Sequence, residues 1–282
     1  MKKYLVLLAV PLLVVLTACQ NQSHEAKPEI VTSFYPMYAF TKAIVGDQVQ
    51  VENIMPSSQD VHEFEPSAQE IAKMSQAKAL VYNDNDLEKW ASKVQTSGKK
   101  IEAAQNVKQI SNDPHTWLSP KEAIIEVNEI SKGLQAEFPQ YKATFAKNTA
   151  AYVKKLQALS DDYQHLSDSK TKIMITQHDA FSYLARDYGL TDVPIAGIDP
   201  EEEPSSQALI KLRQEMKKNN VKYVYSEQNS SSKLADTLAR NTGAKLIELN
   251  TLEAVTTKQE ENGANYLNIM EENLKTLEST LN

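Results

Sequence analysis

The sequence predicts an α/β protein of two similar lobes, with mostly parallel sheets, joined by one long helix. Three observations predict this fold. Short β-rich runs alternate with longer helical patterns, blocks of sequence recur 138 to 144 residues apart, and a long helical stretch lies between the two copies. Strands separated by helices of this length are typical of βαβ units, whose parallel sheets are covered on both faces.

The expected strands are short apolar runs bounded by polar or turn-forming residues. They lie at residues 29–33, 48–54, 79–83, 172–176, 193–198, 221–226 and 245–249. The expected helices show helical spacing of apolar residues, and two of them begin with a capping box, at Ser67 and Ser119. They span residues 38–45, 67–76, 87–96, 119–137, 141–166, 180–188, 205–219, 231–241 and 264–281.

The recurring blocks indicate a diverged internal repeat. The pairs are residues 65–73 (EPSAQEIAK) and 203–211 (EPSSQALIK), residues 81–84 and 224–227, and residues 30–32 and 174–176, at offsets of 138, 143 and 144. Because the blocks keep their order and nearly keep their spacing, we expect two lobes of similar fold.

The segment between the two copies is expected to be a connecting helix. Its apolar residues, from Tyr141 to Leu159, fall near a helical period. A helix of about 27 residues is roughly 40 Å long, which suits a strut between lobes. The expected organisation is a signal peptide at 1–18, a lipidated cysteine with a flexible tether at 19–28, an N-terminal lobe at 29–138, a linker helix at 139–168 and a C-terminal lobe at 169–282.

The N-terminus has the pattern of a secretory signal. Lys2 and Lys3 precede an apolar run that ends at residues 16–19, LTAC. Cys19 is the only cysteine and stands where lipoprotein cleavage requires it, so we expect a lipobox and a lipid anchor on the outer face of the cell membrane. The alternative is an ordinary signal peptide that leaves Cys19 as an incidental free thiol.

The composition is that of an acidic globular protein, with 41% hydrophobic and 24% charged residues. The net charge is −7, and loss of Lys2 and Lys3 with the signal peptide lowers it to −9. An acidic surface argues against a nucleic acid partner and suits a cation as ligand. We expect a monomer.

Three of the five histidines lie in loops that lead to the start of a predicted helix. These are His62, His115 and His178, and Glu253 lies four residues after the strand expected at 245–249. In open parallel sheets, ligands bind beyond the carboxyl ends of the strands, so these side chains are candidates for one crevice. A single loop histidine is more often a hydrogen-bonding surface residue, so the residues alone leave the set a conjecture.

Three imidazoles and one carboxylate suit zinc, which takes such ligands in tetrahedral geometry. Four protein ligands leave no position for a reactive water, which favours capture over catalysis. Two ligands would come from each lobe, so the metal would lie in the cleft and connect the lobes. The acids close to the histidines in sequence could orient the imidazoles or simply be solvated loop residues: Asp60, Glu63, Asp113 and Asp179.

The chain resembles the metal-specific solute-binding lipoproteins of ABC importers, the group that binds zinc or manganese. The likeness extends from the LTAC box to the C-terminal helix. It rests on residues 60–67 (DVHEFEPS), 113–118 (DPHTWL), 176–181 (TQHDAF), 188–190 (YGL) and 197–205 (GIDPEEEPS).

This resemblance implies a metal ion held between two lobes by His62, His115, His178 and Glu253. It also implies that a lipid-anchored protein captures Zn²⁺ outside the cytoplasm and delivers it to a membrane permease that a cytoplasmic ATPase energises. Zinc binders of this group tend to have histidine as the third ligand, where manganese binders have glutamate, and imidazole suits zinc. Residues 97–112 contain no histidine, so the His-rich loop of many zinc-binding members is absent.

Three alternatives stay open at this point. Mn²⁺ or Fe²⁺ could be the cargo in place of Zn²⁺. A secreted metallo-hydrolase would need an open coordination position and a base such as Glu63, but the chain has no H-E-x-x-H motif, so we expect no enzyme. A role as a surface adhesin could exist as a second function.

Overall fold

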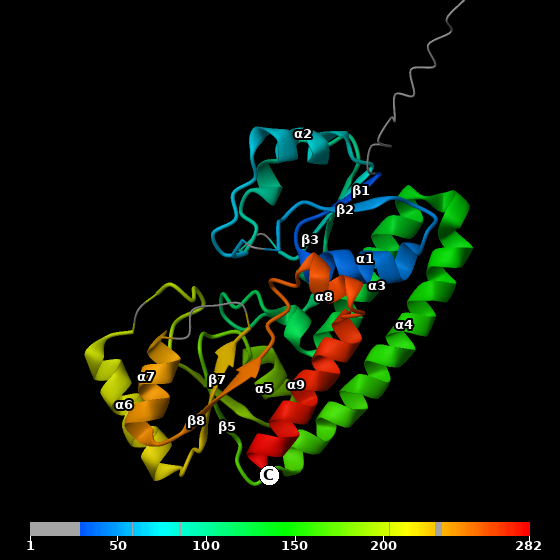
Figure 1. The fold of residues 1–282 in the computed structure, drawn as a ribbon. Helices are drawn as coiled ribbons and strands as arrows, with labels where there is room; N and C mark the ends of the chain where they lie inside the picture. Colours follow the sequence, from blue (N-terminus) through cyan, green and yellow to red (C-terminus); the bar gives the residue numbers. More distant parts are fainter. Residues whose placement is uncertain (1–28, 58, 85, 203, 229–232) are drawn as a thin grey trace, which may run out of the picture.

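The computed structural model describes residues 29–282, except for 58, 85, 203 and 229–232. The predicted signal peptide and tether, with Cys19, lie outside the described residues. The described chain forms two α/β lobes, one blue to cyan and one yellow to orange in Figure 1, which lie along a long green helix. Each lobe has a four-stranded sheet with parallel pairing throughout, so the predicted fold class is confirmed.

The N-terminal sheet has the strand order β2-β1-β3-β4. Its buried central strands are apolar, whereas the outer strands are partly exposed. The strands are β1 (Ile30–Thr32), β2 (Val51–Asn53), β3 (Ala79–Tyr82) and β4 (Lys99–Glu102). The helices are α1 (Tyr35–Val45), α2 (Ala68–Gln76) and α3 (Pro120–Glu137).

The C-terminal sheet repeats this topology with the order β6-β5-β7-β8, which confirms the similarity of the lobes. Its strands are β5 (Ile173–Thr176), β6 (Thr191–Pro194), β7 (Tyr223–Glu227) and β8 (Lys245–Leu249). The helices are α5 (Ser182–Tyr188), α6 (Ser206–Lys218), α7 (Lys233–Thr242), α8 (Thr257–Glu261) and α9 (Tyr266–Leu281). The repeat extends to helix starts, because Ser67 caps α2 and Ser205 caps α6 through the same hydroxyl-to-backbone contact.

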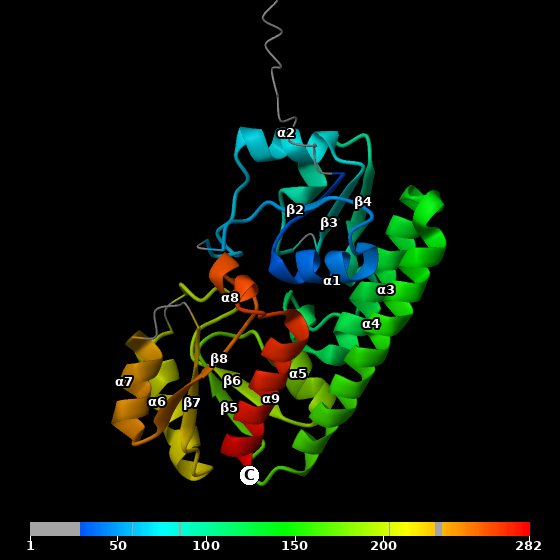
Figure 2. The same ribbon diagram turned by 45° about the vertical axis from the view of Figure 1, so that its right-hand side comes forward.

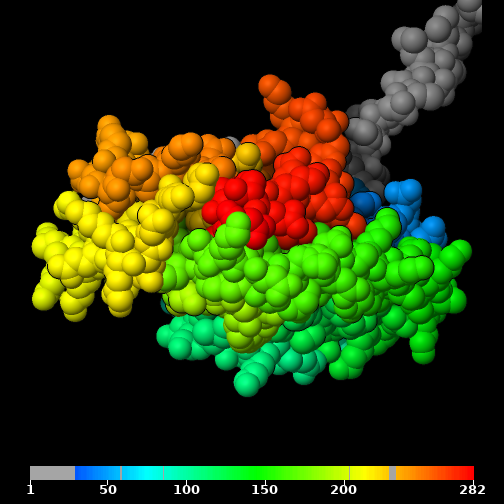
Figure 3. Space-filling view, turned by 90° about the horizontal axis from the view of Figure 1, so that it is seen from below, coloured from blue at the N-terminus to red at the C-terminus, as the bar shows by residue number. Residues whose placement is uncertain are grey.

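The helix α4 (Lys142–Tyr163) runs along both lobes, and short 3₁₀ turns flank it at Pro139–Tyr141 and Gln164–Asp168. It packs beside α3 and α1 in the N-terminal part and beside α9 in the C-terminal part. Figure 2 shows α3 and α4 as neighbours, and Figure 3 shows the red α9 lying against green helices. The Tyr163 hydroxyl donates to the carbonyl of Met270 in α9 at 2.7 Å. The predicted long helix is therefore braced along its length.

One hydrophobic core continues across both lobes. Trp117, before α3, is fully buried, and its Nε1 donates to the Thr251 carbonyl of the C-terminal lobe at 2.8 Å. In return, the Tyr266 hydroxyl of α9 donates to the Trp117 carbonyl at 2.6 Å. A second, separate core lies between the C-terminal sheet and the helices α6 and α7. The lobes are thus joined by shared packing as well as by α4.

The helix predicted at residues 87–96 is wrong, because only the 3₁₀ turn Ala91–Lys93 forms there. The apolar residues do pack inward, which explains the helical spacing. However, Asp84 Oδ1 accepts the backbone N–H groups of Asp86 and Leu87 at 2.8 Å, and the Glu88 carboxylate accepts those of Asn83 and Asp84. These side-chain contacts form an Asx-type turn at Asp84, which offers the backbone an alternative to a helix.

The strands β4 and β6 and the short helix α8 also differ from prediction. The strand β4 was not predicted, because Ile101 is its only apolar residue and it lies at the sheet edge. The strand β6 starts at Thr191 and ends at Pro194, whereas residues 193–198 were expected. The backbone N–H groups of Ile195 and Ala196 still donate to the carbonyls of Thr176, the last residue of β5, and Gln177. The short helix α8 was not predicted; a capping box at Thr256 starts it.

Gly98 allows the chain at the start of β4 to lie close to the backbone before β3. A methyl group at Gly98 would lie 2.0 Å from the Lys78 carbonyl oxygen, which accepts from Lys99 N at 2.7 Å. Because backbone cannot yield as a side chain does, Gly98→Ala is expected to lower the free energy of unfolding by about 3 kcal/mol. Urea denaturation measures this, and the exposed neighbour Ser97→Ala should change it by less than about 0.5 kcal/mol. Equal midpoints for both variants would refute the steric argument.

Among the described residues, no helix combines the length and the apolar character needed to cross a membrane.

Candidate metal centre

The four candidate ligands lie beyond the carboxyl ends of strands in both sheets. His62 lies between β2 and α2, and His115 lies between β4 and α3. His178 follows β5 by two residues, and Glu253 follows β8 by four. Parallel strands present their carboxyl ends at one edge, so the two lobes bring these loops together across the cleft.

All four side chains converge on one point. The Nε2 atom of His115 lies 3.2 Å from Nε2 of His62 and 3.2 Å from Nε2 of His178. Glu253 Oε1 lies 3.3, 3.6 and 3.8 Å from Nε2 of His115, His178 and His62. One ligand atom from each of the four residues lies within 4.8 Å of all the others. The sequence-derived set is thus assembled as expected, two residues from each lobe.

These spacings fit a tetrahedral ion. Four ligands about 2.0–2.1 Å from zinc are about 3.3 Å apart along the edges of the tetrahedron. Most of the observed separations, 3.2 to 3.8 Å, are close to that edge. Glu253 Oε1 is buried and has no hydrogen-bond partner of ordinary geometry among the described residues. A cation at the centre would satisfy this oxygen and the three nitrogens that face it.

The site is nearly closed to solvent. His115 and His178 are 0% exposed, and the side chains of His62 and Glu253 are 7% and 10% exposed. His62 lines an open cavity beside the site, so this ligand faces the way in. A buried site of this kind binds tightly only when every ligand is oriented by its surroundings.

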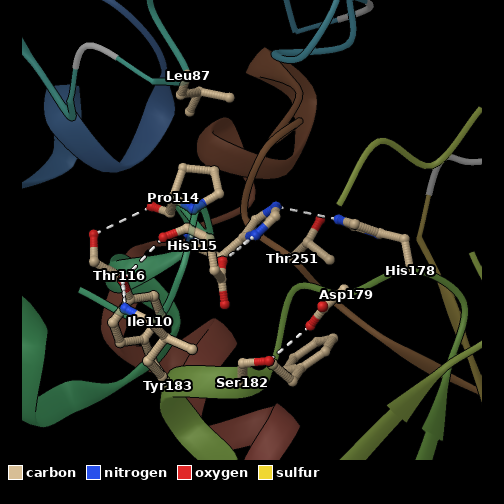
Figure 4. A network of polar contacts seen from close by, with 12 residues as sticks. Leu87, Ile110, Pro114, His115, Thr116, His178, Asp179, Ser182, Tyr183 and Thr251 are labelled. Carbon is tan, nitrogen blue, oxygen red and sulfur yellow. Dashed lines mark hydrogen bonds and ion pairs between the residues drawn. The ribbon is translucent and has the colours of Figure 1, made fainter. Parts of the chain in front are cut away.

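Carboxylates orient two of the three imidazoles through Nδ1. Asp113 Oδ1 lies 2.7 Å from His115 Nδ1, and the carboxylate of Glu227, at the end of β7, contacts His178 Nδ1. Both contacts leave Nε2 to face the centre, and Figure 4 shows the His115 and His178 rings facing each other. This carboxylate–histidine arrangement fixes the tautomer and strengthens the nitrogen ligand.

The four acids predicted near the ligands have different positions. Asp113 contacts the His115 ring, as described above. Asp60 Oδ1 accepts from the backbone N–H of His62 at 2.8 Å and so shapes its loop. Asp179 Oδ1 accepts from the Ser182 hydroxyl at 2.7 Å, at the start of α5 (Figure 4). Glu63 is exposed. Their effect on a bound metal stays a prediction.

Sequence reasoning missed Glu227. The only signal was its place at the end of a predicted strand, in the block that matches residues 81–84 of the first repeat. Nothing in a single sequence separates it from the many other acids. Only the fold brings its carboxylate to His178, which lies 49 residues away along the chain.

The backbone around His115 is held by buried polar contacts. Asn83 Nδ2 donates to the Pro114 carbonyl at 2.7 Å, and the Tyr183 hydroxyl donates to the Asp113 carbonyl at 2.9 Å. The Thr116 hydroxyl donates to Glu126 in α3, and burial raises the pKa of Glu126 to about 8. Both lobes therefore fix this loop, because Tyr183 belongs to α5.

Without metal, the site holds protons. Burial lowers the pKa of His178, but the carboxylates of Glu227 and Glu253 outweigh this and raise it to about 11. Burial likewise opposes protonation of His115, and Asp113 with Glu253 raises its pKa above the usual value. Burial raises the pKa of Glu253, yet the three imidazoles hold it well below the usual range. The metal-free site therefore pairs an ionised Glu253 with a protonated His178.

Replacement of Glu227 tests the orientation of His178. Glu227→Ala leaves Nδ1 of a fully buried imidazole without its partner, so zinc affinity is expected to fall 10- to 100-fold. Competition with a fluorescent zinc chelator measures the change. The control is Glu248→Ala on the neighbouring strand β8, whose side chain is exposed and should leave affinity unchanged. An equal affinity in both variants would show that Glu227 does not support the site.

A family model described as zinc-uptake complex component A, periplasmic (ZnuA), matches residues 30–280. In sequence, the chain is 42% identical over 306 residues to the zinc-binding lipoprotein AdcA of Streptococcus pneumoniae, covering 99% of this chain and 61% of that protein. It is 38% identical over 296 residues to the high-affinity zinc uptake system protein ZnuA of Bacillus subtilis, covering 94% and 93% of the two chains. The chain thus spans less than two thirds of AdcA and nearly all of ZnuA.

Solved structures of the same kind match the fold. The Zn(II)-bound ZnuA-like domain of Streptococcus pneumoniae AdcA has a TM-score of 0.81 at 42% identity, covering 90% of this chain and 99% of that domain. The laminin-binding protein Lmb of Streptococcus agalactiae, described as bifunctional with adhesin and metal transporting activity, has a TM-score of 0.85 at 36% identity, covering 90% and 100%.

Proposed function

Since the chain belongs to the ZnuA family of zinc-uptake components, we propose that it captures Zn²⁺ outside the cytoplasm and delivers it to an ABC-type permease for import. The observation that carries this proposal is the convergence of His62, His115, His178 and Glu253, with ligand atoms spaced as a tetrahedral zinc site requires. We propose these four residues as the ligands.

The donor set supports zinc over manganese. Three imidazole nitrogens and one carboxylate oxygen suit Zn²⁺, whereas Mn²⁺ prefers more oxygen ligands. Relatives named for zinc binding or zinc uptake, AdcA and ZnuA, point the same way. The family is one of metal-binding transport proteins, and four protein ligands leave no coordination position for a substrate water. Zinc is therefore cargo in this proposal, and no reaction is assigned to the site.

Release requires that the two ligand pairs separate. His62 and His115 come from the segment that we propose as the N-terminal lobe, residues 29–138, and His178 with Glu253 from the C-terminal lobe, residues 169–282. Widening the cleft removes two ligands at once, and the shared core around Trp117 limits how far the lobes can part. Binding to the permease would supply the free energy for this movement.

Calorimetry on chelator-stripped protein tests the proposal. We expect one Zn²⁺ per chain near neutral pH, and Zn²⁺ should displace Mn²⁺ in a competition titration. Cells that lack the protein should need added zinc to grow in chelator-treated medium. If calorimetry detects no heat of zinc binding, or if manganese in place of zinc restores growth, the proposal that zinc is the cargo is wrong.

The anchor and partners complete the proposal. We propose that Cys19 carries the lipid that holds a monomer at the outer face of the membrane, beside the permease and its cytoplasmic ATPase. Cys19→Ala should move the protein from the membrane fraction to the medium. Retention of that variant at the membrane would exclude lipidation of Cys19 as the anchor.

Adhesion is a second candidate function, favoured by the likeness to Lmb. Zinc capture is better supported, because the assembled ligand set gives it a site in this chain. A charge-reversal scan of the surface tests adhesion, which predicts variants that lose binding to laminin and keep zinc import.

A further inference from the structure

A cavity of about 500 Å³ opens beside the metal centre. Both lobes form its walls, with Phe64 and Trp90 from the N-terminal lobe and Ile198 from the C-terminal lobe. Among the four proposed ligands, His62 is the one that lines this cavity. Glu253 Oε1, which has no hydrogen-bond partner of ordinary geometry among the described residues, lies 3.8 Å from His62 Nε2. His62 therefore lies between this cavity and the carboxylate of Glu253 at the metal centre.

The charged residues of this cavity are predominantly acidic. Four exposed carboxylates line it, with one exposed amine, Lys89: the acids are Glu65, Asp86, Asp199 and Glu202. None of these acids forms an ion pair in the part of the chain that the structure describes. The cavity is much larger than a bare ion, so a cation can enter it with its hydration shell.

We propose that these four carboxylates form an acidic vestibule that draws hydrated Zn²⁺ to His62 and accelerates its capture. This inference rests on the proposed function, since it concerns access to the same site. A recess lined by one sign of charge, with low-dielectric walls such as Phe64 and Trp90, focuses the field and raises the local concentration of counter-ions.

The vestibule acts on the rate of capture and does not hold the ion. Its carboxylates are exposed and hydrated, so they exchange a hydrated cation rapidly, whereas the buried ligands behind His62 replace the water. Long-range charges change association rates much more than dissociation rates. Zinc should therefore bind more slowly when the acids are neutralised, and a bound ion should leave as before.

The test compares the wild-type protein with the variant Glu65→Gln/Asp86→Asn/Asp199→Asn/Glu202→Gln. Stopped-flow mixing of metal-free protein with zinc chloride can use tryptophan fluorescence, because the Trp117 and His115 rings are 5.2 Å apart. We expect association to slow about tenfold at 10 mM ionic strength and about threefold at 150 mM. Dissociation into excess EDTA should keep its rate, and the zinc stoichiometry should stay at one.

Two matched controls separate the vestibule from net charge and from folding. Neutralising four exposed acids on α4 and α9, Asp162, Glu271, Glu272 and Glu278, changes the net charge equally and should leave the association rate within twofold. Lys89→Gln should increase the association rate. If the vestibule variant binds zinc as fast as the wild type, the vestibule is refuted while zinc capture stands. If the wild type binds no zinc, the proposed function itself fails.

Discussion

Replacement of both His115 and His178 by alanine is expected to eliminate measurable zinc binding. Structural zinc sites with four ligands bind with about 10–16 kcal/mol, which is about 3 kcal/mol per ligand. Each lost imidazole should thus weaken binding by about two orders of magnitude, and the double variant by about four.

Thermal unfolding with and without zinc measures this loss. Saturating zinc should raise the Tm of the wild type, because a ligand of the native state stabilises it by mass action. The double variant should show no rise, although circular dichroism should still report a folded α/β protein. His165→Ala, an exposed histidine after α4, is the control and should keep the full zinc-dependent rise. An undiminished rise in the double variant would place the metal elsewhere.

Zinc affinity is expected to increase steeply with pH. In the metal-free protein the pKa of His178 is raised to about 11, so this imidazole carries a proton around neutral pH; the pKa of His115 is raised as well, so both imidazoles hold their protons more firmly than usual. Zinc needs them neutral, so binding must expel these protons, whereas Glu253 is already ionised and loses none. Affinity should fall about tenfold per pH unit for each proton expelled, or at least about 100-fold between pH 7.5 and 5.5.

Calorimetry in buffers of different ionisation enthalpy counts the protons directly. At pH 7 we expect at least one proton released per zinc, and the apparent binding enthalpy should vary linearly with the buffer enthalpy. Glu227→Ala should release fewer protons, because the carboxylate that holds the proton on His178 is gone. Binding that is independent of pH and of the buffer would contradict the protonated state of the metal-free site.

Much of the fold could be predicted because local signals agree with it. The apolar runs of β1, β3 and β5 and the capping box of α2 act locally. The capping box predicted at Ser119 makes no side-chain cap in the structure, and the one that starts α8 was not predicted. The predictions of secondary structure failed where tertiary contacts determine the local structure. Residues 87–96 have helical spacing, but only the 3₁₀ turn Ala91–Lys93 forms there, after a turn in which the Asp84 and Glu88 carboxylates bind backbone N–H groups. The strand β4 has one apolar residue and forms only because β3 offers a partner.

The candidate site was predicted from position and chemistry together. His62, His115 and His178 lie in loops that lead to predicted helices, Glu253 follows a predicted strand, and the family resemblance singled them out from other loop residues. The exposed Glu63 and the buried Glu227 show the limit of this reasoning, because Glu63 is adjacent to His62 along the chain, whereas Glu227 is 49 residues from His178. The burial of a side chain and the direction in which it points are properties of the folded chain. Of these two glutamates, Glu227 is the one that contacts an imidazole.

The internal repeat suggested two separable lobes, but their separation is incomplete. The Trp117 indole donates to the Thr251 carbonyl and the Tyr266 hydroxyl donates to the Trp117 carbonyl, and both aromatic residues belong to one continuous core. The sequence around Trp117 does not indicate that its side chain will contact the other lobe, because its partner, Thr251, is 134 residues away along the chain. This bridge holds the ligand loops in register and explains why the four ligand atoms are already close.

Anomalous diffraction at the zinc absorption edge, on crystals of the protein grown with zinc, tests the central claim most directly. We predict a single strong peak per chain, within about 2.2 Å of Nε2 of His62, His115 and His178 and of a Glu253 carboxylate oxygen. A peak bound by other residues, or an occupied site that leaves two of these side chains turned away from the metal, would contradict it.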